Sequence, residues 1–355
     1  MADYSWRLPT IVQELAATVQ EPPSRYLLPE QNRPGGLLAC VEMPEVIPTI
    51  DLRRLSANND VQEAAKLRMA LQSWGFFLIT NHGVEASLMD AIISASREFF
   101  GQPLEHKQEY SNLIEGKQWQ LEGYGNDPVK RKDKVLDWSD RVHLKVEPED
   151  ERNIARWPGH PETFRDLLHE YSLSCKKVKD AILRSLAKLL KLDEHSLINQ
   201  FGDKASTYAR FNYYPPCARP DLVLGIRPHC DVGVLTLLLM DKDVGGLQVL
   251  RDGTWYSVPP VRDQGLLVNI GASLEIMTNG VFRGPMHRVV TNSEKERISL
   301  AMFYAVDPEK DIEPMADLLG ENQPARYMKV KGKDFVPGQY EYFSRREGVL
   351  DSLKI

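Results

Sequence analysis

The spacing of apolar residues divides the chain into a helical part and a part made of short strands. Up to about residue 197, apolar residues recur three and four positions apart, as on one face of an amphipathic helix. This spacing predicts helices at residues 8–19, 61–73, 86–100 and 161–192. Bulky or alternating runs between them predict short strands at residues 47–52, 74–80 and 137–146.

After residue 197, Pro, Gly and Asp separate short apolar runs, a pattern typical of strands. Strands are expected at residues 207–214, 222–226, 234–240, 246–250, 254–258, 266–270, 287–291 and 298–306. Asp252-Gly253 predicts a hairpin turn, and residues 273–277 predict one helical turn capped by Ser273. Regularly spaced strands after a helical region predict a mainly β protein with flanking helices, an α+β fold built on a sandwich or barrel.

Three further segments are expected to connect or cover these elements. Residues 24–46 are rich in Pro, Gly and Arg and predict an extended linker, and residues 117–125 and 128–135 predict loops. Residues 335–346 carry Tyr340, Tyr342 and Phe343 and predict a final helix. That helix either covers the mouth of the barrel or packs its aromatic side chains on the core.

Composition narrows the class of protein. The 355 residues include 44 Lys and Arg against 50 Asp and Glu, a net charge of -6, which argues against a nucleic-acid-binding surface. The N-terminus lacks the basic and apolar regions of a signal peptide, and no apolar run reaches membrane-spanning length. The four cysteines are scattered without a Cys-x-x-Cys pair. We therefore expect a cytoplasmic protein with free thiols.

The strongest chemical signal is a possible metal site. His229 and Asp231 are two positions apart, so on extended backbone both side chains face the same side. His287 precedes another β-branched run and is a candidate third ligand. Two imidazoles and one carboxylate on one side of an ion are typical of non-haem Fe(II) oxygenases. His82, in an Asn-His-Gly sequence, is instead expected to stabilise a turn.

Two more pairs of polar residues share a strand face near these candidates. Arg297 and Ser299 open the strand expected from Arg297 to Tyr304. A guanidinium beside a hydroxyl suits a bound carboxylate. Asn212 and Tyr214 end the strand expected at 207–214 and add an amide and a phenol. The pattern therefore predicts a polar cavity that can bind a metal and a carboxylate.

His-x-Asp, a distant His and Arg-x-Ser, in this order and on expected strands, resemble the plant 2-oxoglutarate/Fe(II)-dependent dioxygenases. The resemblance covers residues 47–306 and includes the segments Trp74-Gly-Phe-Phe77, Asn81-His-Gly83, Asn212-Tyr-Tyr-Pro215 and Gly245-Gly-Leu-Gln-Val249. The chain departs from the family's usual pattern at two places. Cys230 stands where Thr or Ser is usual, and Gly271-Ala-Ser273 stands where Gly-Asp is frequent.

The resemblance implies a double-stranded β-helix, or jelly-roll, core and an oxygenase reaction. The family binds Fe(II) and uses 2-oxoglutarate and O2 as co-substrates, so the reaction would release succinate and CO2 while a substrate is hydroxylated. Ascorbate is expected to support activity.

The resemblance also implies roles for individual residues. His229, Asp231 and His287 would bind iron. The far carboxylate of 2-oxoglutarate would be held by Arg297, Ser299 and Tyr214, and Asn212 would lie near its metal-chelating end.

A substrate pocket is expected beside the metal. Phe303 shares the inward face with Arg297, Arg210 shares one with Asn212, and Arg141 shares one with His143, and the resemblance places these regions around the substrate. Because an unpaired cation in a partly dry pocket is costly, two arginines there favour an acidic or enolic substrate. The alternative is that Arg141 and Arg210 turn outward or pair with Asp137, Asp140 or other acids of the protein.

The resemblance is closest to a cereal oxygenase that hydroxylates β-triketone herbicides, and to its relatives. It rests there on residues 5–15, 110–116 and 136–140. It implies a small specialised metabolite or xenobiotic as substrate, or a hormone or flavonoid as in other members of the family. The rival functions are a metal- or ligand-binding jelly roll without catalysis and a zinc hydrolase.

The patterns and the resemblance together divide the chain into five regions, expected to act as a monomer without nucleic-acid or membrane partners. They are an N-terminal helix and linker (1–46), an N-terminal dioxygenase region (47–160), spine helices (161–200), a jelly-roll catalytic core (201–306) and a C-terminal lid helix (307–355).

Overall fold

The computed structural model describes residues 11–34, 40–44, 46–57, 60–114, 118–127, 135–262, 264–335 and 349–355. Its helices are α1 (Val12–Ala16), α2 (Leu52–Ser56), α3 (Val61–Ser73), α4 (Ala86–Phe100), α5 (Leu104–Gln108), α6 (Phe164–Leu189), α7 (Ser196–Asn199) and α8 (Ala272–Met277). The strands of its two large sheets are β1 (Cys40–Glu42), β2 (Thr49–Asp51), β3 (Phe76–Thr80), β6 (Gly123–Gly125), β7 (Asp140–Glu147), β8 (Thr207–Tyr214), β9 (Ile226–His229), β10 (Leu235–Leu239), β11 (Leu247–Arg251), β12 (Thr254–Ser257), β13 (Leu266–Ile270), β14 (His287–Val289) and β15 (Arg297–Tyr304). Two small two-stranded sheets pair β4 (Leu113–Ile114) with β5 (Gln118–Trp119) and β16 (Asp311–Ile312) with β17 (Val330–Lys331).

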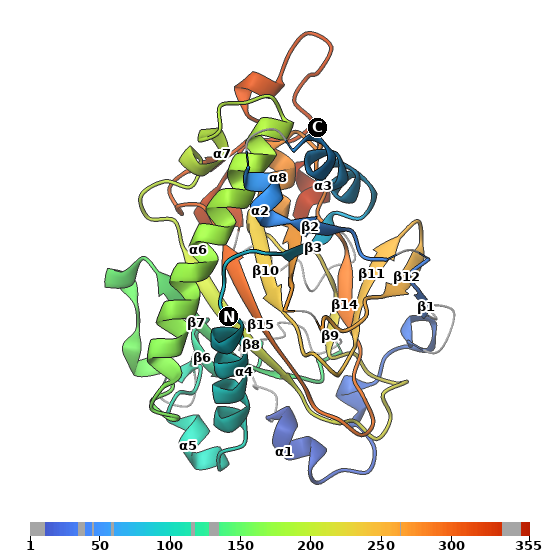
Figure 1. Cartoon of the computed structure of the whole chain (residues 1–355). Helices are drawn as coiled ribbons and strands as arrows, with labels where there is room; N and C mark the ends of the chain where they lie inside the picture. The colour runs from blue at the N-terminus through green and yellow to red at the C-terminus, as the bar shows by residue number, and fades with distance from the viewer. Residues whose placement is uncertain are drawn as a thin grey trace, which may run out of the picture.

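The two large sheets pack against each other at the centre of the molecule. The larger has eight strands in the order β2-β3-β13-β10-β15-β8-β7-β6, and the smaller has five in the order β1-β12-β11-β14-β9 (Figure 1). Phe76 and Leu267 from the larger sheet share one apolar cluster with Leu247, Val249 and Val289 from the smaller sheet. The expected mainly β architecture with flanking helices is confirmed.

Helices cover the opposite face of the larger sheet (Figure 1). Because side chains alternate along a strand, Ile298, Leu300 and Met302 of β15 point into the main core, which they share with Leu168 and Ile182 of α6. The residues between them on β15 face the other side, toward the smaller sheet. This division leaves the inner face of β15 available for polar side chains.

Most of the expected elements are present. The bounds predicted for α3, α4, β8 and β13 agree with those observed. The predicted hairpin joins β11 to β12, where Arg251 pairs with Thr254. Asp252 and Gly253 have φ values of 50° and 78°, which explains the Asp-Gly sequence at this turn. His82 stabilises its turn as expected, because its Nδ1 accepts from the amide of Val84 at 3.1 Å.

Three local expectations were wrong. Residues 117–125 are not simply a loop, because they include β5 and β6. Residues 222–226 do not form a strand of either sheet, and β9 begins only at Ile226, since Leu222 and Leu224 instead accept hydrogen bonds from the backbone of Leu28 and Trp138.

The expected cap of α8 is also wrong. Ser273 lies inside the helix, where its Oγ donates to the carbonyl of Val232 at 2.6 Å, and Gly271 takes the N-cap position.

The ends of the chain are described only in part. The first expected helix is seen as the short α1, whose Val12 and Gln13 amides donate to the Asp140 carboxylate at 2.9 and 2.7 Å. The expected linker contains two short 3-10 turns and β1, which pairs with β12. Of the expected C-terminal helix, all but Phe335 falls outside the described residues. Within the described ranges, no helix is long and apolar enough to cross a membrane.

Candidate active site

The three predicted metal ligands lie together at the edge of the cavity between the sheets. His229 ends β9 and pairs with His287 at the start of β14, and Asp231 follows His229 by two residues. Asp231 Oδ1 is 3.6 Å from His229 Nε2 and 3.8 Å from His287 Nε2. One donor atom of each residue lies within 4.8 Å of the other two, so the three could bind a single ion.

Backbone carbonyls orient both imidazoles. His229 Nδ1 is 2.9 Å from the carbonyl of Arg227, and His287 Nδ1 is 3.1 Å from that of Pro285. Since a carbonyl only accepts hydrogen bonds, each Nδ1 is the donor, and each Nε2 is the ring nitrogen that faces Asp231. Burial and the neighbouring His287 lower the pKa of His229, which favours the neutral form that binds metals.

Asp231 is held by two neutral donors that the sequence analysis missed. Its Oδ2 accepts from Thr236 Oγ1 at 2.6 Å and from Asn269 Nδ2 at 2.8 Å, which leaves Oδ1 facing the histidines. Burial raises the pKa of Asp231, but the histidines and these hydrogen bonds outweigh it, so the pKa is lower than usual. Thr236 and Asn269 are paired across β10 and β13. In the sequence, each could have been noticed as the single polar residue of an otherwise apolar strand.

Cys230 does not face the metal site. In an extended segment its side chain points opposite to those of His229 and Asp231, and it packs beside the main core. A Cβ on Gly284 would lie 2.5 Å from the Cys230 sulfur, so this glycine makes room for the thiol. The departure from the usual Thr or Ser therefore leaves the ligand set intact.

The residues expected to hold 2-oxoglutarate form a buried group on β8 and β15. The register pairs Arg297 with Tyr214 and Ser299 with Asn212. The Arg297 guanidinium lies 5.1 Å from the Tyr214 ring centre, its Nη1 is 3.4 Å from Ser299 Oγ, and Asn212 Nδ2 is 3.5 Å from the same hydroxyl. Arg297 Nε is buried and has no hydrogen-bond partner among the described residues. A buried, unsatisfied cationic donor fits a carboxylate ligand.

Aromatic residues line the cavity further along the same strands. Phe303 pairs with Tyr208 on β8, and both rings contact the imidazole of His143 on β7, with centroid distances of 6.4 and 5.1 Å. Burial lowers the pKa of His143 well below its usual value, and Arg141 and Arg210 add to this effect. His143 Nδ1 is buried without a hydrogen-bond partner among the described residues. A neutral imidazole with a free polar atom can bind a ligand.

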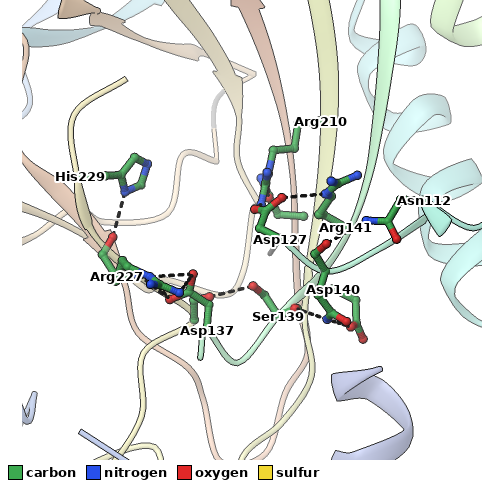
Figure 2. A network of polar contacts seen from close by, with 12 residues as sticks. Asn112, Asp127, Asp137, Ser139, Asp140, Arg141, Arg210, Arg227 and His229 are labelled. Carbon is green, nitrogen blue, oxygen red and sulfur yellow. Dashed lines mark hydrogen bonds and ion pairs between the residues drawn. The ribbon is translucent and has the colours of Figure 1, made fainter. Parts of the chain in front are cut away.

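The expectation of two unpaired arginines in this wall was wrong, and the alternative of internal ion pairs is correct. Arg210 donates to Asp127 Oδ2 at 2.7 Å and Arg141 Nε donates to Asp127 Oδ1 at 3.1 Å (Figure 2). Burial raises the pKa of Asp127, but the two guanidiniums outweigh it and hold the pKa well below its usual range. Sequence reasoning missed Asp127 because it lies outside any strand pattern, two residues after β6.

A second ion pair completes this wall. The Arg227 guanidinium contacts both carboxylate oxygens of Asp137 at 3.1 to 3.2 Å (Figure 2). We call the five residues Arg141, Arg210, Arg227, Asp127 and Asp137 the arginine cluster. All five line a small polar pocket, and all but Arg141 also line the main cavity.

The main cavity joins these groups. Its lining includes the three metal ligands, the four residues expected to hold 2-oxoglutarate, and Phe303, His143 and Arg210. Apolar side chains of both sheets, including Phe76, Leu238, Leu247, Val249 and Leu267, complete the wall. Of the expected site residues, Arg141 alone lies outside this lining, behind Asp127.

The chain is similar to known proteins over nearly its whole length. Residues 206–306 match the 2OG-Fe(II) oxygenase superfamily, and residues 47–160 match the N-terminal region described for a non-haem dioxygenase in morphine synthesis. Codeine O-demethylase of Papaver somniferum is 38% identical, with 92% of this chain and 90% of that protein covered. Jasmonate-induced oxygenase 2 of Arabidopsis thaliana is 36% identical, with 97% and 91% covered.

Solved structures show the same fold. A crystal structure of JOX2 in complex with 2OG, Fe and JA has a TM-score of 0.87 and 35% identity, with 99% of both chains covered. The rice dioxygenase for auxin oxidation has a TM-score of 0.73 and 25% identity, with 87% of this chain and 100% of that chain covered. These structures are 2-oxoglutarate oxygenases, so the expected double-stranded β-helix core is confirmed.

Proposed function

We propose a substrate class and residue roles for this chain, which belongs to the 2OG-Fe(II) oxygenase superfamily and is a dioxygenase that uses Fe(II) and 2-oxoglutarate. Its substrate is a small specialised metabolite or xenobiotic, which it hydroxylates while 2-oxoglutarate is converted to succinate and CO2. The observation that carries this proposal is the single cavity that runs from the His229, Asp231 and His287 cluster to the aromatic wall at Phe303.

The protein's contribution is to hold the reactants. His229, Asp231 and His287 would hold Fe(II), which would supply the oxidation chemistry of the reaction. Arg297 binds the far carboxylate of 2-oxoglutarate through its free Nε, with Ser299 and Tyr214 beside it. Asn212 lies next to Ser299 and orients the co-substrate. The four residues that hold 2-oxoglutarate are almost fully buried, which limits the access of water to the far carboxylate.

The part of the cavity wall further along β7, β8 and β15 binds the substrate. Phe303 and Tyr208 offer aromatic surfaces, and His143 offers a hydrogen bond from a neutral ring. The arginine cluster adds guanidiniums to this part of the wall, and those of Arg210 and Arg227 line the main cavity. These cations favour an acidic or enolic molecule, such as a cyclic dione of the triketone-herbicide type.

A substrate panel read by mass spectrometry tests the proposal. Triketone herbicides, JA, auxin and alkaloid methyl ethers, together with other phenolic and terpenoid metabolites, are incubated with the protein, Fe(II), 2-oxoglutarate and ascorbate. We expect at least one triketone or other acidic cyclic compound to gain one oxygen with a matching amount of succinate. Turnover restricted to neutral compounds contradicts the acidic class, and no succinate above background with any compound contradicts the proposed substrate range.

We also propose that the protein is a cytoplasmic monomer. The four free cysteines, which are separated in the structure, suit a reducing compartment. Cell fractionation and light scattering of the purified protein test these two points.

A further inference from the structure

We propose that Asp127 is a specificity-determining residue that excludes carboxylate substrates by occupying their binding position. The Asp127 carboxylate bridges Arg141 and Arg210 at the cavity wall, and its side chain is 25% exposed. The inference rests on the proposed function, because it concerns the substrate that enters this cavity.

The two guanidiniums form a carboxylate site of ordinary geometry. They come from neighbouring strands β7 and β8, and each donates to a different oxygen of Asp127 (Figure 2). Such two-pronged contacts are how proteins bind carboxylates of ligands. Here the protein fills the site with its own carboxylate.

Both arginines are held in place by groups other than Asp127. Arg210 Nε donates to Asn212 Oδ1 at 2.7 Å, and Arg141 Nη1 donates to the carbonyl of Gly123 at 2.8 Å. These partners belong to β8 and β6, so they remain when the Asp127 carboxylate is removed. The site therefore stays formed in a variant without the internal anion.

The charge of the cluster depends on Asp127. Asp127 places one negative charge against the guanidiniums of Arg141 and Arg210. His143, the neighbouring titratable group on β7, is neutral and does not change this contribution. Replacement of Asp127 by a neutral residue therefore makes the site more positive by one charge.

Asp127 thus sets which substrates are accepted. A substrate carboxylate would have to displace Asp127 or lie beside it as a like charge, which is unfavourable at short range. The enolate of a cyclic dione carries its charge on oxygens of two different ring carbons and on the carbon between them, so it does not need the two-pronged contact that a compact carboxylate makes. The wild-type cavity therefore admits an enolic or neutral ring and disfavours a compact carboxylate.

The test measures binding to the protein loaded with Fe(II) and 2-oxoglutarate under anaerobic conditions. Calorimetry gives the dissociation constants of phenylacetate, its neutral methyl ester, and an acidic cyclic dione for the wild type and Asp127→Asn. We expect Asp127→Asn to bind phenylacetate at least tenfold more tightly, to gain less for the dione, and to bind the ester within twofold of the wild type.

Three further variants make the result specific. Asp150→Asn removes one negative charge at an exposed position outside the cavity and should leave all three dissociation constants unchanged. Asp127→Ser replaces the carboxylate by a smaller group and should repeat the gain if Asp127→Asn folds poorly. Arg210→Met added to Asp127→Asn should remove the gain, whereas a general loosening of the cavity would not depend on Arg210.

The inference is overturned if phenylacetate affinity is unchanged in both Asp127 variants, if the ester gains equally, or if no variant binds phenylacetate at millimolar concentration. Failure of the proposed function is seen separately, as a wild type that oxidises no compound of the panel. A wild type that hydroxylates the dione, with Asp127 variants that show no charge preference, contradicts only the role of Asp127.

Discussion

The metal site and the arginine cluster are the two polar regions of one cavity, and they are held by different kinds of contact. At the metal site, neutral groups fix each ligand: the donors Thr236 and Asn269 for Asp231, and backbone carbonyls for both histidines. In the arginine cluster, charged groups hold one another, and Asp127 comes from outside the strands. The geometry of the metal site is therefore preset, whereas the charge of the arginine cluster can change with one residue.

The largest effect is expected from removing a metal ligand. Replacing His229, Asp231 or His287 by Ala should abolish iron-dependent succinate formation, because two remaining ligands hold the ion weakly. The fold should persist, since these residues lie outside the apolar clusters. Asp231→Ala also leaves two buried hydrogen-bond donors without an acceptor and should cost about 1–3 kcal/mol of stability. Metal analysis, succinate assays and thermal unfolding check these outcomes, and full activity in any variant contradicts the metal site.

A smaller effect is expected from the neutral groups behind the ligands. Asn269→Ala removes one hydrogen bond to Asp231 Oδ2 and should weaken iron binding by about 10–100-fold, as for other groups that orient metal ligands. Activity should recover at high Fe(II) concentration. Iron titrations measure this, with the exposed Asn322→Ala as a control expected to match the wild type. Unchanged iron affinity would mean that Asp231 needs no such orientation.

A more modest effect is expected from the residues proposed to hold 2-oxoglutarate. Arg297→Lys keeps the charge but loses the planar fork, so KM for 2-oxoglutarate should rise roughly tenfold, with kcat less affected. Steady-state kinetics with each substrate varied in turn separate the two constants. If only KM for the main substrate changed, Arg297 would belong to the substrate-binding part of the cavity instead.

The smallest effect concerns pH and His143. Because its pKa is lowered in the folded protein, His143 takes up a proton near its ordinary pKa only when unfolded. Its contribution to stability is therefore complete above about pH 6.5 and is lost as the pH falls below that value. Between about pH 7.5 and pH 5, His143→Phe should therefore lose about 1–2 kcal/mol less stability than the wild type loses.

Urea unfolding at the two pH values measures the difference for His143. The matched control is His195→Gln, which also removes one imidazole, but from a side chain that is half exposed. If acid lowers the free energy of unfolding equally in the wild type and His143→Phe, His143 is protonated in the folded protein.

The sequence by itself determined the elements and the residue types of the site. Local patterns were sufficient for α3, α4, β8 and β13, because the two helices have a regular repeat and the two strands are short runs between turn signals. His229 with Asp231, and Arg297 with Ser299, were recognisable because residues two apart on a strand share a face. These inferences need only neighbours in sequence.

Only the tertiary structure decided which distant groups meet. Thr236 and Asn269 contact Asp231 through the pairing of β10 with β13, and Asp127 reaches Arg141 and Arg210 from a segment without regular periodicity. The sequence supplied the two arginines but not their partner, since an ion pair depends on a distance that no local repeat encodes. The charge of the arginine cluster is therefore a property of the fold, because it depends on segments far apart in sequence coming together.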